Sequence, residues 1–333
     1  MDPTSPHVTP PPAPRRPPYL LIAVTVLAVA LVAAEVTEVV RRARLPRPPA
    51  VDTTGLDPAV ARAIGSARAR VEKDLLSGKA WGSLGQVYMA HAYNSEADAC
   101  LVRAAALDPG EARWPYLLFE VRRPTSPETG LPHLERSVEL CGDVLSPRLV
   151  LGEVLFEGGQ LERAEGQFRA VLGRNPPNPR AHFGLGRIAL ARGDLVAGTD
   201  HLTKAAAAAP GFKAVHASLA QVYHRRSMTQ EEKHELELVA ALPNAWVWPN
   251  PYLKEVTDRW VGLSAGISWA RELEKRGQAR DAVKVLESLR TDYPDSPRLW
   301  LVLGSMLNGL GDFPKAEQAA REAVRTDQNR AAA

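Results

Sequence analysis

Residues 81–88 read Trp-Gly-Ser-Leu-Gly-Gln-Val-Tyr, and small or apolar residues follow at fixed offsets, at Ala97, Leu101, Ala104 and Pro109. The same residue types recur 34 positions apart, as at Leu117, Leu151, Leu185 and Leu219, and again in the pairs Trp269 and Leu303, Gly277 and Gly311, and Ala282 and Ala316. A fixed period of this size indicates stacked helix-turn-helix units, because a single unit cannot bury its apolar face alone. The sequence therefore predicts an all-α solenoid.

The first copy, residues 81–109, resembles the tetratricopeptide-repeat family almost residue for residue. The resemblance implies a right-handed superhelix of antiparallel helix pairs. In each pair, small residues such as Gly85 and Ala97 allow close approach, and large ones such as Trp81 and Tyr88 fill the space beside the contact.

The repeat register divides the chain into eight segments. We expect a disordered, proline-rich tail at 1–18, a transmembrane helix at 19–40, a linker rich in Arg and Pro at 41–56, a capping helix at 57–77, repeats one to five at 78–246, an insertion rich in aromatic residues and proline at 247–262, repeats six and seven at 263–328, and a tail at 329–333. The repeats are expected to start near Gly78, Glu111, Leu145, Pro179, Lys213, Leu263 and Pro297. The second repeat is degenerate because two prolines separate its helices, and the fifth because it lacks a turn glycine after Ser227.

The segment 19–40 is apolar enough to meet a membrane, and its 22 residues match the length of about 20 that a spanning helix needs. We expect an uncleaved signal-anchor, because the apolar run is long and ends at Arg41 and Arg42. A cleaved secretory signal is the alternative, since small residues such as Ala30 and Ala34 stand at suitable cleavage offsets. We expect a single-pass protein of the cell membrane with an exported repeat domain. The distribution of arginines favours the cytoplasmic side, which stays open.

The insertion interrupts the 34-residue period with a dense set of aromatic residues, Trp246, Trp248, Tyr252 and Trp260. Asn250 followed by Pro251 is a typical helix start and predicts a helix to about Trp260. Two interpretations remain open. The rings could plug the solenoid between the fifth and sixth repeats, or form a platform for docking a peptide.

Motifs for chemistry are absent from the sequence. It has no phosphate-binding or dinucleotide-binding glycine loop, no Cys-x-x-Cys and no His-Glu-x-x-His, so we expect no cofactor, no metal and no catalysis. An enzyme would have to build its site within the solenoid. His182 and His216 stand 34 residues apart at the position of Trp81 and are expected to pack. Cys100 and Cys141 are interpreted as separate thiols. The net charge of +3 argues against nucleic acid as a partner.

The resemblance implies a concave groove that binds peptides of partner proteins. The residues expected to face it, or to form the docking platform, are Gln86, Met89, Glu153, Phe156, Arg187, Leu190, Gln221, His224, Trp246 and Trp248. Packing between repeats is an equal alternative for Met89, Phe156 and Leu190. A clamp for a C-terminal carboxylate is not expected, because Gly82 and Gln86 replace the Lys and Asn that such family members use.

These observations predict a membrane-anchored interaction scaffold or assembly factor without catalysis. The alternative is an accessory subunit of a membrane-associated redox or transport enzyme that docks through the insertion. Exposure of the aromatic cluster would separate the two, because a large exposed apolar patch favours permanent docking.

Overall fold

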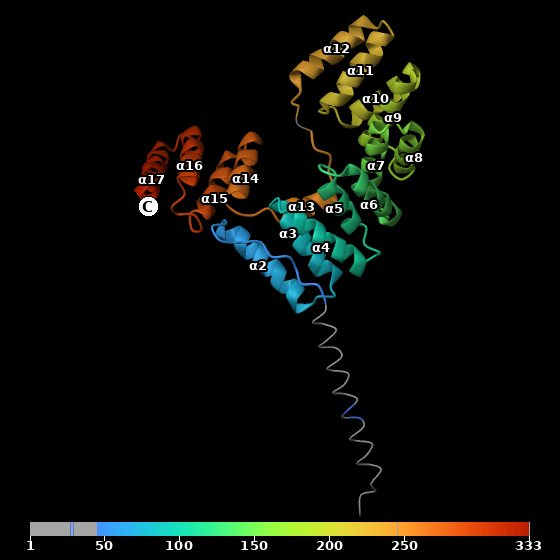
Figure 1. Ribbon diagram of the computed structural model, residues 1–333. Coiled ribbons are helices and arrows are strands. Elements are labelled where there is room, and N and C mark those ends of the chain that lie inside the picture. The colour runs from blue at the N-terminus through green and yellow to red at the C-terminus, as the bar shows by residue number, and fades with distance from the viewer. Residues whose placement is uncertain (1–26, 28, 30–44, 245, 333) are drawn as a thin grey trace, which may run out of the picture. The chain divides into compact units, whose positions relative to one another are not determined.

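The computed structural model describes residues 27, 29, 45–244 and 246–332, and the repeats lie in one compact unit, Pro48–Ala333 (Figure 1). All regular elements in these residues are helices, which confirms the all-α prediction. The expected tail at 1–18 and the expected membrane helix at 19–40 lie outside the described residues, apart from Leu27 and Val29. None of the described helices combines the length and the apolar character needed to cross a bilayer.

The helices form seven pairs, with one further helix before the pairs and one within the insertion. The first helices of the pairs are α3 (Gly78–Ala90), α5 (Arg113–Arg122), α7 (Ser146–Glu157), α9 (Pro179–Arg192), α11 (Lys213–Arg225), α14 (Leu263–Lys275) and α16 (Pro297–Gly309). The second helices are α4 (Asn94–Leu107), α6 (Pro127–Leu140), α8 (Leu161–Leu172), α10 (Leu195–Ala208), α12 (Thr229–Ala241), α15 (Ala279–Leu289) and α17 (Phe313–Ala332). The two others are α2 (Pro58–Lys73) and α13 (Pro251–Thr257).

Local signals explain where these helices begin and turn. The side chain of Asn178 accepts a hydrogen bond from the backbone N–H of Ala181, which caps α9 directly before its first-turn proline. After α9, Gly193 adopts a left-handed conformation with φ of 80°. In the fifth repeat Ser227 takes this place with φ of 56°, so the turn forms without the glycine that the sequence lacks.

Large rings fill the spaces that glycines leave between neighbouring first helices. Phe168 of α8 is fully buried, and a Cβ placed on Gly152 of α7 or Gly184 of α9 would come within 2.7 Å or 2.4 Å of its ring. Gly82 has the same relation to Trp114 of the next repeat, at 2.3 Å. These close approaches set the spacing between successive repeats.

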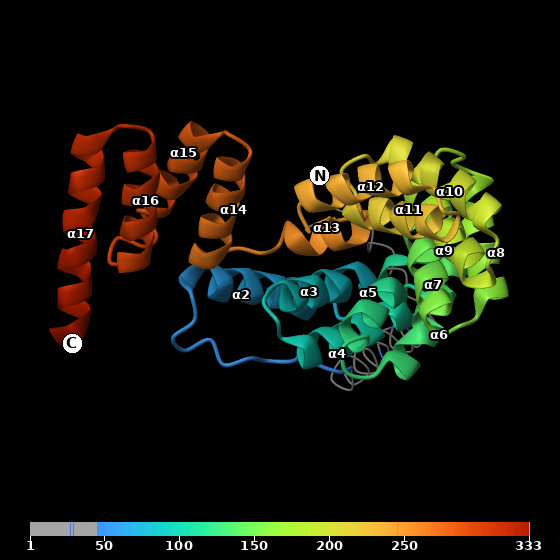
Figure 2. The same ribbon diagram turned by 90° about the horizontal axis from the view of Figure 1, so that it is seen from above.

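The described core divides into three clusters. One runs from α2 to α9, a second joins α9 to α11, and a third holds α14 to α17. Helix α12 buries no residue and packs on α11, and the substantial helix contacts of α14 are with α15 and α16. The insertion between them turns back to the first two repeats, where α13 contacts α3 and α5 (Figure 2). The interpretation of α13 as a plug between the fifth and sixth repeats therefore does not describe this helix.

The segments flanking the repeats differ from the sequence expectation. Part of the expected linker at 41–56 packs on the repeats, because Pro48 is buried and the Tyr88 hydroxyl donates a hydrogen bond to the Pro49 carbonyl at 2.7 Å. At the other end, α17 continues to Ala332, beyond residue 328 where the last repeat was expected to end.

Candidate functional site

The first helices of repeats one to five form a surface that we call the first-helix face. Helix α13 lies on its α3 and α5 part and makes polar contacts there (Figures 1 and 2). The Glu255 carboxylate accepts hydrogen bonds from the Gln86 amide at 2.8 Å and from the Arg113 guanidinium at 2.9 Å. Arg259 donates to the Gln86 side-chain oxygen at 2.8 Å. The expected groove residue Gln86 is thus buried and bound by the chain's own insertion.

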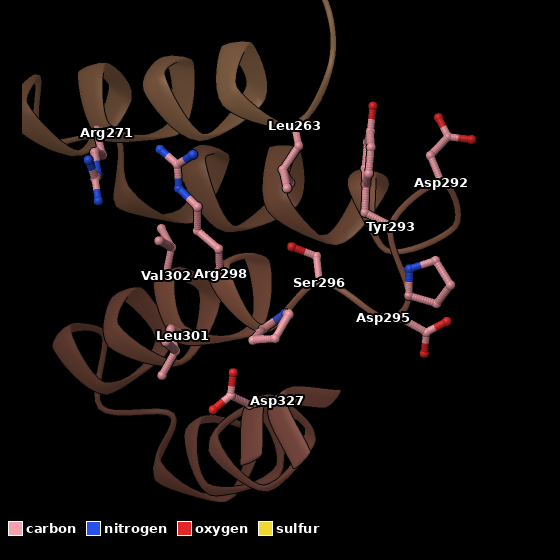
Figure 3. A pocket seen from close by; sticks show the side chains of 12 residues that line it. Leu263, Arg271, Asp292, Tyr293, Asp295, Ser296, Arg298, Leu301, Val302 and Asp327 are labelled. Atoms are coloured by element: carbon pink, nitrogen blue, oxygen red, sulfur yellow. The ribbon is translucent and has the colours of Figure 1, made fainter. Parts of the chain in front are cut away.

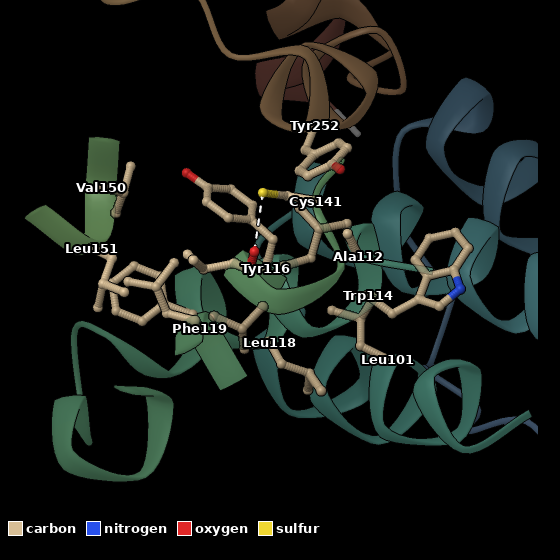
Figure 4. Packing of buried hydrophobic residues seen from close by; sticks show 14 of the residues in the cluster. Leu101, Ala112, Trp114, Tyr116, Leu118, Phe119, Cys141, Val150, Leu151 and Tyr252 are labelled. Atoms are coloured by element: carbon tan, nitrogen blue, oxygen red, sulfur yellow. Dashed lines mark hydrogen bonds between the residues drawn. The ribbon is translucent and has the colours of Figure 1, made fainter. Parts of the chain in front are cut away.

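An aromatic contact also holds α13 on this surface, which we call the seat of α13. The buried Tyr252 ring of α13 lies 5.5 Å from the Tyr116 ring of α5 and joins the large core cluster (Figure 4). The Tyr116 hydroxyl accepts a hydrogen bond from the Asn250 amide at 2.7 Å and donates one to Glu120 at 2.6 Å. Burial raises the pKa of Tyr252 to about 12 and also raises the pKa of Tyr116, so both phenols stay protonated at neutral pH.

A row of aromatic side chains continues along the first-helix face, and we call it the aromatic row. The Arg187 guanidinium lies 4.1 Å from the Phe156 ring centre and 5.5 Å from that of Phe183. Phe183 meets Phe212 at 4.9 Å, and Phe212 meets Trp248 at 4.8 Å. This row links α7 and α9 to the insertion through rings and one stacked cation.

A cavity of about 610 Å³ lies beside the aromatic row. Its wall combines the insertion with the first turns of α7 and α9, and includes Trp246, Trp248, Leu149 and Arg180. Arg180 is almost fully buried, and its guanidinium makes two hydrogen bonds to the Glu153 carboxylate, at 2.6 and 2.7 Å. The mixed apolar and charged wall has the chemistry of a small ligand or side-chain pocket.

The structure brings some of the expected site residues together and leaves others apart. Phe156 and Arg187 stack in the aromatic row, Trp248 is half-buried there and Trp246 is 39% exposed beside it. Leu190 is buried in the core, and Met89 and Phe156 are partly buried against it.

Among the other expected site residues, the sequence did not separate those engaged within the fold from those exposed to solvent. Glu153 is engaged by Arg180, whereas Gln221 and His224 are exposed on α11. Several contact residues were missed, because lone polar and aromatic residues carry no motif: Arg113, Tyr116, Glu255, Arg259, Phe183 and Phe212.

His182 and His216 have the structural role expected for them. At four equivalent repeat positions a ring nitrogen lies within hydrogen-bond distance of the backbone carbonyl six residues earlier, in the pairs Trp81 and Leu75, His182 and Pro176, His216 and Pro210, and Trp300 and Pro294. The described residues contain no group of three or more His, Cys, Asp or Glu side chains placed to hold a metal ion. Cys100 and Cys141 are buried free thiols, and burial raises the pKa of Cys100 to about 12.

The last two repeats have a cavity of their own, of about 820 Å³ (Figure 3). Arg271 of α14 and Arg298 of α16 line it together with Leu301 and Val302, and Asp327 of α17 lies at its edge. Arg298 donates a hydrogen bond to the Ser264 hydroxyl at 3.3 Å. Charges of both signs surround this cavity, so it does not select a ligand of one charge.

Four histidines that are buried or partly buried make stability depend on pH. Burial is the main cause that lowers the pKa of His91, His133, His182 and His201 in the folded state. The unfolded chain, with histidine pKa values of about 6.5, therefore binds more protons below that pH. We expect the histidine contribution to the free energy of unfolding to be fully present above about pH 7 and to be lost as the pH falls between about 6.5 and 5.

Urea unfolding followed by helical circular dichroism at several pH values measures this effect. The variant His201→Gln, which removes one titrating group, should show a shallower fall. A free energy of unfolding that rises on acidification through this window would contradict the assignment.

Comparisons with known proteins agree with the fold. The tetratricopeptide repeat family profile matches residues 149–212 and 267–331, and the curated proteins give no significant match. Among solved structures, YrrB, described as a TPR protein with an unusual peptide-binding site, is 26% identical over 45% of this chain and 78% of its own, with a TM-score of 0.40.

Two further solved structures are also similar. PilW, a type IV pilus biogenesis factor, is 16% identical over 55% of this chain and 85% of its own, with a TM-score of 0.46. PilF of Pseudomonas aeruginosa is 16% identical over 70% of this chain and 97% of its own, with a TM-score of 0.45. The family assignment comes from the matched profile together with the 34-residue period and the helix pairs that follow it. The chain contains tetratricopeptide repeats, which the family profile matches over residues 149–212 and 267–331.

Proposed function

We propose that this protein is an interaction scaffold that binds partner peptides along the aromatic row, between α7 and the insertion. The stacked Arg187 supports this assignment most directly. Its guanidinium lies over two half-buried rings, and the described part of the chain supplies it with no carboxylate partner. A partly buried cation on an aromatic surface is an anchor for an acidic group of a partner.

The cavity beside the row supplies the second half of the proposed site. An apolar side chain of the partner would enter between Trp246, Trp248 and Leu149 while its acidic group pairs with Arg187. The proposal includes no catalysis. It also keeps the segment 19–40 as a membrane anchor, on the strength of its sequence, and an exported repeat domain, with the cytoplasmic side as the alternative that the arginine distribution favours.

The test compares two arginine reversals in the full chain. Arg187→Glu should abolish crosslinked recovery of the partner from native membranes, because it reverses the anchor charge. Arg169→Glu is the matched control, since this arginine of α8 is 72% exposed and pairs with Glu165. Equal partner recovery by the wild type and Arg187→Glu, with both folded, would overturn the proposed site.

Permanent docking through the insertion is a second candidate, because part of the aromatic segment is exposed. Val247 is 88% exposed, and Trp246 and Trp260 are 39% and 42% exposed. The variant Val247→Asp separates the two functions. If the peptide site at Arg187 is the functional one, this variant should still bind its partner peptide. If the variant loses a stable complex with its partner protein, docking through the insertion is favoured.

A further inference from the structure

Helix α13 has the geometry of a peptide bound to a receptor. It is seven residues long and lies between two segments without regular secondary structure, at 243–244 and 246–250 before it and at 258–262 after it. A helix of this length is not stable alone in water, because nucleation costs more than so few hydrogen bonds return. Its conformation therefore depends on the surface of α3 and α5 that it covers.

The polar contacts of α13 with this surface are specific. Glu255 takes one hydrogen bond from Gln86 of α3 and one ion-paired hydrogen bond from Arg113 at the start of α5. Arg259, two residues after the end of α13, donates to Gln86 and, at 3.3 Å, to the Ser83 hydroxyl. Gln86 thus contributes its amide nitrogen to the carboxylate and its oxygen to the guanidinium, which fixes the direction of the bound segment.

The apolar contacts come from the same helix. Tyr252 is 6% exposed and lies over Tyr116, and Leu253 and Val256 are partly buried against the same core cluster. The Arg113 guanidinium also lies 5.9 Å from the Tyr252 ring centre. An aromatic residue and a carboxylate three residues later therefore meet the surface together on one side of the helix.

We propose that the surface of α3 and α5 is a second peptide-binding site, and that α13 is its intramolecular occupant. Its external ligand is a short helical peptide with an aromatic residue, a carboxylate three residues later and a basic residue four residues after that. This inference extends the proposed scaffold function to a surface separate from Arg187.

Bound α13 determines how high the affinity of an external peptide must be to displace it. A tethered segment competes at an effective concentration that reaches the millimolar range for short linkers. The apparent affinity of an external peptide is its intrinsic affinity multiplied by the fraction of molecules in which α13 has left this surface. Weakening the seat of α13 should therefore strengthen binding of the external peptide.

The experiment uses the full chain in mild detergent and a fluorescein-labelled peptide of residues 249–260, with fluorescence anisotropy as the readout. In the variant Tyr252→Ala/Glu255→Ala the peptide should bind at least about tenfold more tightly than in the wild type. A second variant, Glu255→Lys, reverses the charge facing Arg113 and keeps the buried ring. It should also bind the peptide more tightly. Lys254→Ala is the matched control, because this lysine of α13 is 72% exposed. The substitution leaves the contacts of α13 with α3 and α5 unchanged.

A control peptide with the same Tyr→Ala and Glu→Ala changes should not bind to any of these proteins. The inference is overturned if Glu255→Lys keeps its helix content and binds the peptide no more tightly than the wild type. Partner recovery that depends on Arg187 would persist in that case, so this failure is distinguishable from failure of the proposed function. Peptide binding that is unchanged by Arg187→Glu would support two separate sites.

Discussion

Replacing Phe168 by alanine is expected to lower the free energy of unfolding by about 3–5 kcal/mol, because the ring is fully buried and the backbone around it is fixed. The ring of α8 fills the space left by Gly152 of α7 and Gly184 of α9. Removing the ring therefore leaves a cavity that two helices border. The loss should therefore lie near the upper part of the range for buried phenylalanine.

Urea unfolding monitored by circular dichroism measures this loss, with Gly184→Ala as the complementary change. Alone, the added methyl group would clash with the Phe168 ring and cost about 1–3 kcal/mol. In the double variant Phe168→Ala/Gly184→Ala the methyl enters the space that the ring leaves. The loss of unfolding free energy in the double variant should therefore be smaller than the sum of the losses in the two single variants. Additive losses would show that the ring and the glycine do not share this contact.

The repeat positions could be predicted from sequence because helix pairing in this fold is local. Five of the seven first helices begin at the expected residues, Gly78, Pro179, Lys213, Leu263 and Pro297, and α7 and α5 begin one and two residues later than expected. Each pair packs mainly on its neighbours in sequence, so the period carries the register. The start of α13 at Pro251 was likewise predicted, because its cap is a local signal.

The position of α13 on the first two repeats could not be predicted in this way. The hydrogen bond between Gln86 and Glu255 joins residues 169 apart in sequence, and neither residue belongs to a motif. The period identified Gln86 as a residue of the groove surface. It gave no signal that the chain itself would supply what binds there.

Sequence position also did not separate residues with a structural role from residues available to a partner. Glu153 and Arg187 occupy equivalent groove-facing offsets of successive repeats, yet Glu153 is held by a buried arginine and Arg187 stacks on rings. The difference comes from Arg180 and Phe156, which reach Glu153 and Arg187 across the contact between α7 and α9.

Replacing Glu153 by alanine is therefore expected to destabilise the fold by about 3 kcal/mol, because it leaves the Arg180 charge buried without its partner. Glu153→Gln keeps one hydrogen-bond acceptor and should cost less. Arg180→Met/Glu153→Ala removes both charges, and should restore most of the loss because methionine keeps apolar bulk at the cavity wall. Urea unfolding of the three variants provides the comparison, and an equal loss in Glu153→Ala and the double variant would contradict the role assigned to the pair. If the expected order is found, reduced partner binding by Glu153→Ala reports lost stability, and Arg187 is the residue with which the peptide site should be tested.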